Sequence, residues 1–355
     1  MIRSTTNGTL KSYRYNLQRS TYNLNSSRNT VLTGRNFNTF SEDPATATRC
    51  FQLRRSYTKT NSQHAIGDSV VRKYEVAWST LDSVSQDLHT TAEDSALTAV
   101  IRGTTDSTAA GRCALGQELR ELAEGLVQKM NVKYGDNFVF AGADGLNVPF
   151  NIKDGELTYR NIPVDCSPEN PDNPTVISDF EKLQTLNDQE KKYVDIGLGM
   201  QEDADDNLIQ SSVFDAALHG INFLGYGTDE DGDPKNVISL VDRMGQILEN
   251  CDKDGNFAQP EDKEELNRLF KKFELATSNF AKKYTELDTH AAFLKSNQSQ
   301  LESTAYTLQE QILELEDADP AEAITAFSWA QYCYNSALKV GNSILSESLM
   351  DYLQT

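Results

Sequence analysis

The sequence predicts a mainly α-helical protein with an inserted β-rich domain, in which long N- and C-terminal helices form a coiled-coil-like layer. Near both ends of the 355-residue chain, apolar residues recur three and four positions apart, which is the spacing of one helix face. Between residues 142 and 235 the pattern changes to short alternating stretches, and six of the nine prolines lie there. Alternating stretches bounded by turn residues favour strands.

The closing segment of the chain predicts one long helix with a marked start. Asp319 suits the N-cap, Pro320 suits the first helical position, and Glu322 can complete a capping box. A long apolar stripe must be buried against a partner, so Leu338 and Leu345 are expected to be buried where this helix meets another. The residues predicted to form its assembly interface are Ile324, Phe327, Tyr334, Leu338, Leu345 and Leu349.

The opening segment predicts the partner helix. Leu10, Leu17, Leu24 and Val31 recur every seven residues and complete the predicted interface. Residues 1–60 hold ten basic and two acidic residues, a net charge of +8, whereas residues 301–355 hold one lysine and nine acidic residues, a net charge of −8. Opposite charge and matched periodicity predict that the two ends pack together. The alternative is two independent, solvated helices.

The elements between the ends follow from the same patterns. A second helix is expected to begin at Asp43-Pro44 in the same way as the last begins at Asp319-Pro320, and to run over residues 44–101 with a break near Gly67. Further helices are expected at 115–132, 236–249, 261–277 and 280–315. Strands are expected at Val148–Lys153, Glu156–Arg160, Val176–Phe180 and Tyr193–Leu198. The predicted division is an N-terminal assembly helix (1–40), an N-terminal helical half (41–141), a separable β-rich surface domain (142–235), a C-terminal helical half (236–316) and a C-terminal assembly helix (317–355).

Motifs at both ends resemble the bacterial flagellin family. Leu32, Gly34 and Arg35, followed by Asp43-Pro44, are similar to the family's N-terminal signature. The helix that opens at Asp319-Pro320 is similar to its C-terminal domain, and the matches cover roughly residues 1–140 and 265–355. In this family the termini form a coiled-coil layer between subunits.

A third motif, where the helices meet the insertion, resembles the hook-associated branch of that family. It consists of Phe138, Phe140 and Gly142, followed by the pair Pro149-Phe150. The family more often has a tyrosine where Asn137-Phe138 stands. The resemblance implies a structural subunit at the junction of the flagellar hook and filament, assembled as a homo-oligomeric ring.

The same resemblance implies partners and a location. The partners are the first hook-associated protein on the hook side, flagellin on the filament side and a cytoplasmic export chaperone. The location is the extracellular flagellum, reached through the flagellar type III apparatus. The start of the chain has no apolar signal-peptide core, which is compatible with that route.

Composition argues against several other classes. A formal net charge of −20 makes nucleic acid and anionic membranes poor partners. The chain contains no run of 18 apolar residues, so no membrane-spanning helix is expected. The five cysteines lie far apart, and the chain has no C-x-x-C, H-E-x-x-H or G-x-S-x-G motif. We therefore expect no enzyme activity and no cofactor.

One segment weakly resembles a calcium loop. Asn250, Asp252, Asp254 and Glu261 occupy positions 1, 3, 5 and 12 of an EF-hand-like frame. Ala258 and Pro260 are atypical of such a loop, and the alternative is an ordinary turn between helices.

Two other functions remain open from the sequence. The first is flagellin itself, the filament subunit. The second is a secreted, calcium-dependent binding protein or adhesin whose β-rich insertion holds the ligand.

Overall fold

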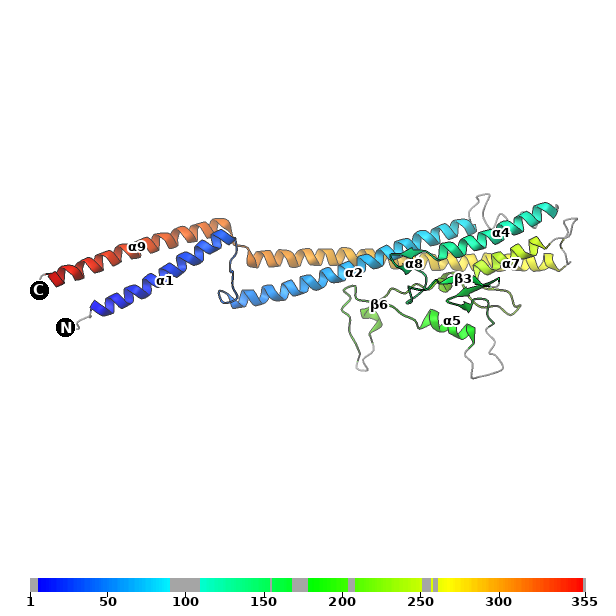
Figure 1. The fold of residues 1–355 in the computed structure, drawn as a ribbon, viewed down its shortest axis with the longest axis horizontal. Helices are drawn as coiled ribbons and strands as arrows, with labels where there is room; N and C mark the ends of the chain where they lie inside the picture. The colour runs from blue at the N-terminus through cyan, green and yellow to red at the C-terminus, as the bar shows by residue number, and fades with distance from the viewer. Residues whose placement is uncertain are drawn as a thin grey trace. The chain divides into compact units, whose positions relative to one another are not determined.

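The computed structural model describes residues 6–89, 109–153, 155–167, 178–203, 208–250, 257 and 261–353 (Figure 1). The chain divides into two compact units. The terminal unit consists of residues 1–61 and 302–355, and the central unit consists of residues 62–301. Helices α2 (Pro44–His89) and α8 (Asp262–Glu316) each contribute to both.

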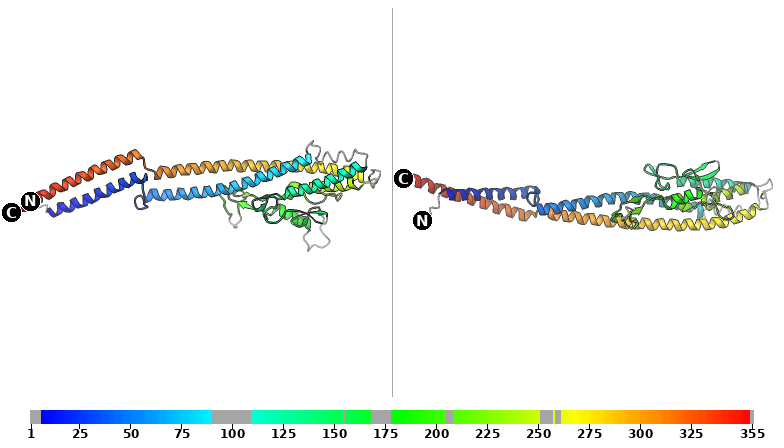
Figure 2. Two further views of the ribbon diagram at one scale, coloured as in Figure 1. Left: turned by 45° about the horizontal axis from the view of Figure 1, so that its top comes forward. Right: turned by 90° about the horizontal axis from the view of Figure 1, so that it is seen from below.

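The terminal unit is built on two paired helices. Helix α1 (Thr6–Thr33) lies beside α9 (Pro320–Leu353), and the start of α1 is next to the end of α9 (Figures 1 and 2). The predicted packing of the two chain ends is therefore confirmed, and it is antiparallel.

The two connections at the other end of this pair are hydrogen-bonded to each other. The Asn36 backbone N–H donates to the Glu316 carbonyl at 2.7 Å, and the Asn36 side-chain amide donates to the carbonyls of Leu315 and Asp317. The Ala318 N–H donates to the Gly34 carbonyl at 2.9 Å. Gly34 ends α1 with a φ of +66°, a conformation that glycine adopts without strain.

Aspartates begin two of these helices, as predicted. Asp319 accepts hydrogen bonds from the N–H groups of Ala321 and Glu322, at 2.8 and 3.5 Å. Asp43 accepts from the Thr46 hydroxyl at 2.6 Å and from two backbone N–H groups of α2. These hydrogen bonds, that from the Thr46 side chain foremost, lower the pKa of the Asp43 carboxyl.

Four helices form the framework of the central unit. They are the part of α2 from Ser62, α4 (Ala109–Met130), α7 (Val237–Glu249) and the part of α8 up to Leu301. Helices α4 and α7 pack closely because Gly116 and Gly245 face each other. A Cβ at Gly116 would lie 2.7 Å from the Gly245 carbonyl oxygen.

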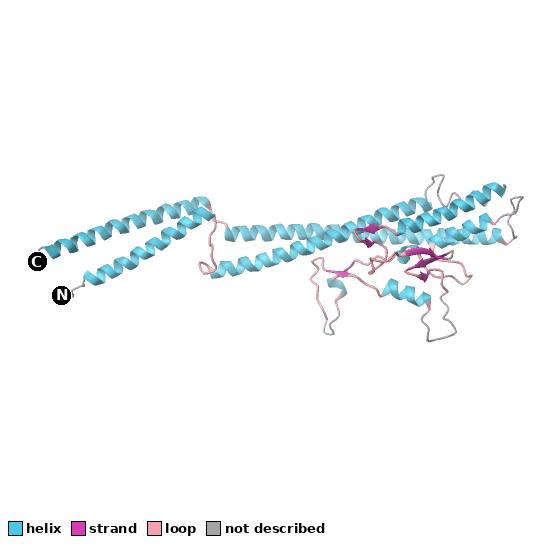
Figure 3. Cartoon of the chain, in the orientation of Figure 1, coloured by secondary structure: helices cyan, strands magenta, loops and turns pink. Residues whose placement is uncertain are grey.

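Short antiparallel strands and small helices complete this unit (Figure 3). Strands β1 (Lys133–Tyr134) and β2 (Asn137–Phe138) form a hairpin, and β6 (Tyr193–Val194) pairs with β7 (Phe214–Asp215). A three-stranded sheet has the order β3 (Phe150–Lys153), β4 (Glu156–Tyr159), β5 (Ile162–Pro163). The remaining elements are α5 (Asp179–Asp188), the 3-10 turn η1 (Gln210–Ser212) and α6 (Gly220–Leu224). The predicted fold class, mainly α with an inserted β region, is confirmed.

Several predicted boundaries are wrong. Helix α2 continues through Gly67, which is buried beside Gln298 of α8. Helix α8 is continuous across residues 278–279, because buried Thr277 and Phe280 anchor that turn to the core. Phe180 belongs to α5, which starts with a capping box between Ser178 and Glu181. The predicted helix over residues 90–101 lies outside the described residues.

The segment 142–235 shares one hydrophobic core with the helices of the central unit. Its separability as a domain stays a prediction. Phe150 exchanges two hydrogen bonds with the Asn131 side chain, at 2.8 and 3.0 Å. The Tyr159 hydroxyl donates to the Phe140 carbonyl, and the Asn297 side chain of α8 donates to the Ile196 carbonyl. These polar contacts join the insertion to helices on both sides of it in the sequence.

The N-cap of α7 gives a test of this core. Asn236 is fully buried, accepts from the N–H groups of Ile238 and Ser239, and donates to the Gly225 carbonyl at 2.7 Å. We expect Asn236→Ala to lower the free energy of unfolding by about 2–4 kcal/mol, from the lost cap and the unpaired carbonyl. Urea denaturation followed by circular dichroism measures the change. The exposed Gln246→Ala should cost less than about 0.5 kcal/mol, and equal effects of the two substitutions would contradict this role.

Candidate assembly surface

The seam between α1 and α9 is made of small and half-buried residues. On α1 the half-buried positions include Leu10, Tyr13, Leu17 and Leu24, so the seven-residue spacing of the leucines marks one face of the helix. On α9 the most buried residues recur three, four and seven positions apart, and their common face consists of Ala323, Phe327, Ala330, Tyr334, Ala337 and Gly341.

Gly341 and Tyr13 explain why part of this seam is small. A Cβ at Gly341 would overlap the hydroxyl end of the Tyr13 ring. The tyrosine of α1 thus occupies the space that a side chain at position 341 would need, and the two helices approach closely there.

Three of the predicted interface residues lie outside this seam. Ile324 is 55% exposed, Leu338 is 42% exposed and Val31 is 38% exposed. Leu338 does not face α1, because Ala337 and Gly341 take the inner positions and Leu338 is rotated about 100° from Ala337. Its place in an interface stays a prediction. Leu345 and Leu349 fall in the part of α9 whose side chains are not described.

Large aromatic residues also lie on the outside of the pair. On α1, Tyr15 and Tyr22 are 67% and 66% exposed and stand seven residues apart. On α9, the rings of Trp329 and Tyr332 stack on each other with centroids 5.8 Å apart, although both remain about two-thirds exposed. Sequence analysis missed these four residues. The repeat from Tyr15 to Tyr22, parallel to that of the leucines, is the signal that could have found the first two.

Helix α1 carries positive charge, and among the side chains that the structure describes no carboxylate of α9 pairs with it. Its four basic residues, Lys11, Arg14, Arg19 and Arg28, are exposed, and the helix has no acidic residue. No ion pair joins α1 to α9 among the residues that the structure describes. Apolar packing, rather than specific ion pairs, therefore holds the described part of the seam together.

The residues of the N-terminal motif surround the connection between α1 and α2. Leu32 is 70% exposed, and Gly34, Arg35 and Asp43 form the hydrogen-bonded turns described above. Pro44 is the first residue of α2. A cavity of about 420 Å³ lies there, lined by apolar residues including Phe37, Phe40, Cys50 and Phe51.

An ion pair lies at the edge of this cavity. The Arg54 guanidinium donates to the Glu316 carboxylate at 2.6 Å, and both residues line the cavity. The Glu316 side chain is 12% exposed.

The residues of the aromatic motif are buried in the central unit. The residues that pack inside it are Phe138, Phe140, Pro149 and Phe150. The ring centroids of Phe150 and Tyr159 are 5.1 Å apart. Gly142, with a φ of +75°, lies against the His219 ring and leaves no room for a side chain. Burial lowers the pKa of His219. The motif therefore shapes the core rather than a surface.

The predicted calcium loop is largely outside the described residues, including Asp252 and Asp254. Asn250 is the C-cap of α7, and the Glu261 carbonyl accepts the first backbone hydrogen bond of α8.

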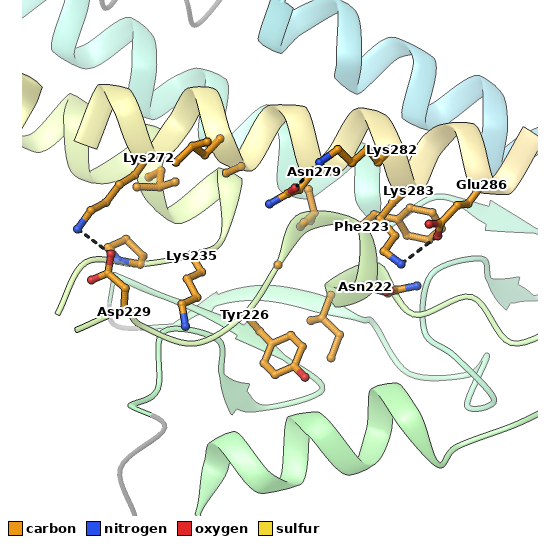
Figure 4. A pocket seen from close by; sticks show the side chains of 17 residues that line it. Asn222, Phe223, Tyr226, Asp229, Lys235, Lys272, Asn279, Lys282, Lys283 and Glu286 are labelled. Atoms are coloured by element: carbon orange, nitrogen blue, oxygen red, sulfur yellow. Dashed lines mark hydrogen bonds and ion pairs between the residues drawn. The ribbon is translucent and has the colours of Figure 1, made fainter. Parts of the chain in front are cut away.

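An acidic turn elsewhere gathers three carboxylates around an ammonium group. The Lys272 Nζ lies 2.6, 2.8 and 2.5 Å from carboxylate oxygens of Asp229, Asp231 and Asp233. The Arg268 guanidinium also donates to Asp233, at 2.7 Å. Figure 4 shows Lys272 reaching Asp229 at one end of a cavity of about 570 Å³. The lysine occupies the centre that a cation would need.

The fold is mainly helical, with paired chain ends and a β region inserted between the helices of the central unit. Among solved structures, it is similar to a putative flagellar hook-associated protein from Vibrio parahaemolyticus, with a TM-score of 0.56 and 15% identity over 78% of this chain and 100% of that one. FlgL from Xanthomonas campestris is similar with a TM-score of 0.47 and 14% identity, and FlgL from Bacillus cereus with 0.43 and 15%, each over 74% of this chain and 99% of the other. No protein-family model and no curated protein sequence matches the chain. None of the described helices is long and apolar enough to cross a membrane.

The Tyr13–Gly341 contact makes the seam testable. Gly→Ala in a helix usually stabilises by about 0.5–1 kcal/mol, and Gly125 of α4 has no atom within 4 Å of its Cβ position. We expect Gly125→Ala to stabilise its helix, whereas Gly341→Ala displaces Tyr13 and speeds amide hydrogen exchange in α1. Exchange in α1 that is equally slow in both variants would contradict the seam.

The lysine–aspartate cluster predicts acid sensitivity. Burial opposes ionisation of Asp229 and Asp233, but hydrogen bonds from Lys272, and for Asp233 also from Arg268, lower the pKa of both below the ordinary 3.8. Their contribution to stability is complete well above pH 4 and is lost as the pH falls through the lowered pKa values. We expect Lys272→Met to cost about 2 kcal/mol near pH 7 and to flatten this acid dependence. Lys271→Met, on the exposed face of the same helix, should change neither the stability near pH 7 nor its acid dependence.

Proposed function

We propose that this chain is a structural subunit of the bacterial flagellum that acts as an adapter at the hook–filament junction, equivalent to the third hook-associated protein. The observation that carries the proposal is the surface of the α1–α9 pair. Exposed apolar residues there include Tyr15, Tyr22, Trp329 and Tyr332 on the outside of the pair. Exposed apolar clusters of this kind are typical of protein interaction sites.

The charge distribution supports assembly between chains. Helix α1 presents only positive charge, whereas Glu322 lies in the first turn of α9. In the proposed assembly, the positive charge of α1 attracts acidic surfaces of neighbouring subunits. In the proposed assembly, copies form a ring through their terminal helices.

Similarity of fold to a putative flagellar hook-associated protein supports the same class. The proposed neighbours are the first hook-associated protein and flagellin, and the proposed route is export by the flagellar type III apparatus with a cytoplasmic chaperone. The aromatic motif from Phe138 to Phe150 favours the junction role over a filament subunit, because the resemblance of that motif is to the hook-associated branch.

Electron microscopy of cells that lack the protein tests the role. We expect intact hooks without filaments, together with flagellin released into the medium. Normal filaments in these cells would contradict the proposal. Loss of flagellin itself, together with long filaments formed by the purified protein, would identify a filament subunit instead.

A pair of charge substitutions tests the surface. Leu338→Asp/Leu345→Asp is expected to abolish assembly and motility, because unpaired charge in an apolar interface costs several kcal/mol. The control is Asn335→Asp/Asn342→Asp, which adds the same charge at the same spacing on α9. Both asparagines are polar and exposed, so this variant should leave assembly intact. Full motility of the leucine variant would exclude these residues from the interface.

A further inference from the structure

The central unit contains a second cavity, of about 590 Å³, between α2, the β1–β2 hairpin and the chain leading into β6. Its apolar wall includes Ile66, Val70 and Phe138. Two lysines, Lys73 and Lys192, line the same cavity. This size lies within the range of small-molecule sites, which combine apolar walls with a few polar groups.

Lys73 is buried without a carboxylate. Its Nζ has one protein partner among the described residues, the Ala216 carbonyl oxygen at 2.8 Å. An ammonium group has three donors, so two are left for a ligand. In contrast, Lys129 and Lys272 each contact a carboxylate. A partly buried lysine without such a partner is unusual in a chain with 53 acidic residues.

The carboxylate closest to these lysines is already engaged. Asp215 accepts hydrogen bonds from the backbone N–H groups of Lys192 and Ala217, both at 3.0 Å, and lies 3.4 Å from the Lys191 Nζ. It therefore does not pair with Lys73 or with the Lys192 side chain.

The other ionisable groups around the cavity leave its potential positive. Tyr134 and exposed Asp136 line it from the β1–β2 hairpin. The Lys133 Nζ lies nearby, 4.4 Å from the centroid of the Phe138 ring. Two lysines and one exposed acid thus line an apolar space.

We propose that this cavity binds a small organic anion with an apolar body. The negative head lies between Lys73 and Lys192 and accepts the free donors of Lys73. The apolar body lies against Ile66, Val70 and Phe138. This site lies wholly within the central unit, whereas the proposed function rests on residues of the terminal unit.

The protonation of Lys73 gives the site a pH dependence. Burial and the neighbouring Lys192 lower the pKa of Lys73 to about 8, although Asp215 raises it in part. An anion binds the protonated amine and raises this pKa. Affinity should therefore be full below about pH 7 and fall as the pH rises through the pKa of the free protein.

Isothermal titration calorimetry with three probes tests the proposal on the full chain. Hexanoate has both a head and a body, acetate has only the head, and 1-hexanol has only the body. We expect hexanoate to bind at least tenfold more tightly than either of the others at pH 6.5, and to weaken by pH 9.5. Lys73→Met should reduce hexanoate affinity about tenfold or more. Lys263→Met, an equal charge change on an exposed residue, should not.

Labelling of the unaltered protein gives a second readout if Lys73→Met fails to fold. An amine-acylating reagent should modify Lys73 with a pH midpoint near 8, and hexanoate, but not 1-hexanol, should protect it. Absence of hexanoate binding at millimolar concentration, equal binding by Lys73→Met, or equal protection by both probes would overturn the proposal.

Discussion

The hydrogen-bonded link between the two connections of the terminal unit is the constraint on which its architecture depends. Through Asn36 and Gly34, the turn after α1 is fixed to the turn before α9. The two turns are about 280 residues apart in the sequence. Because α1 ends and α9 begins at this one point, the two helices lie side by side there, and little apolar burial is needed to keep them together. That constraint explains how a seam of alanine, glycine and half-buried leucine suffices.

A seam of small residues has a consequence for the outer surface. On α9, Ala323, Ala330 and Gly341 face inward, so the larger residues Ile324, Trp329 and Leu338 lie outside. An isolated, soluble helix pair would place them the other way round. The observed arrangement exposes apolar area on α9, and that exposure is the physical basis of the proposed assembly role.

The sequence predicted the helical elements and their starts well, because caps and periodicity are local signals. Asp43 and Asp319 cap as expected. The sequence could not predict which side of α9 faces α1. Hydrophobicity favours Leu338 over Gly341 at the inner position, and only the space taken by the Tyr13 ring reverses that preference. The unbroken helix at Gly67 likewise depends on a distant residue, Gln298. For the same reason the sequence did not show that the insertion shares a core with the helices, since the Asn131–Phe150 hydrogen bonds follow no periodic pattern.

The buried position of the aromatic motif limits what a resemblance at those residues can mean. Phe140 and Phe150 are fully buried, and Gly142 is required by the close approach of His219. Selection on such residues acts on packing, so the motif identifies a way of joining an insertion to a helical framework. A preference for one neighbouring chain over another must instead arise on surfaces that such chains can contact. Tyr15, Tyr22, Trp329 and Tyr332 meet that condition, and their side chains are large enough to decide which partner fits.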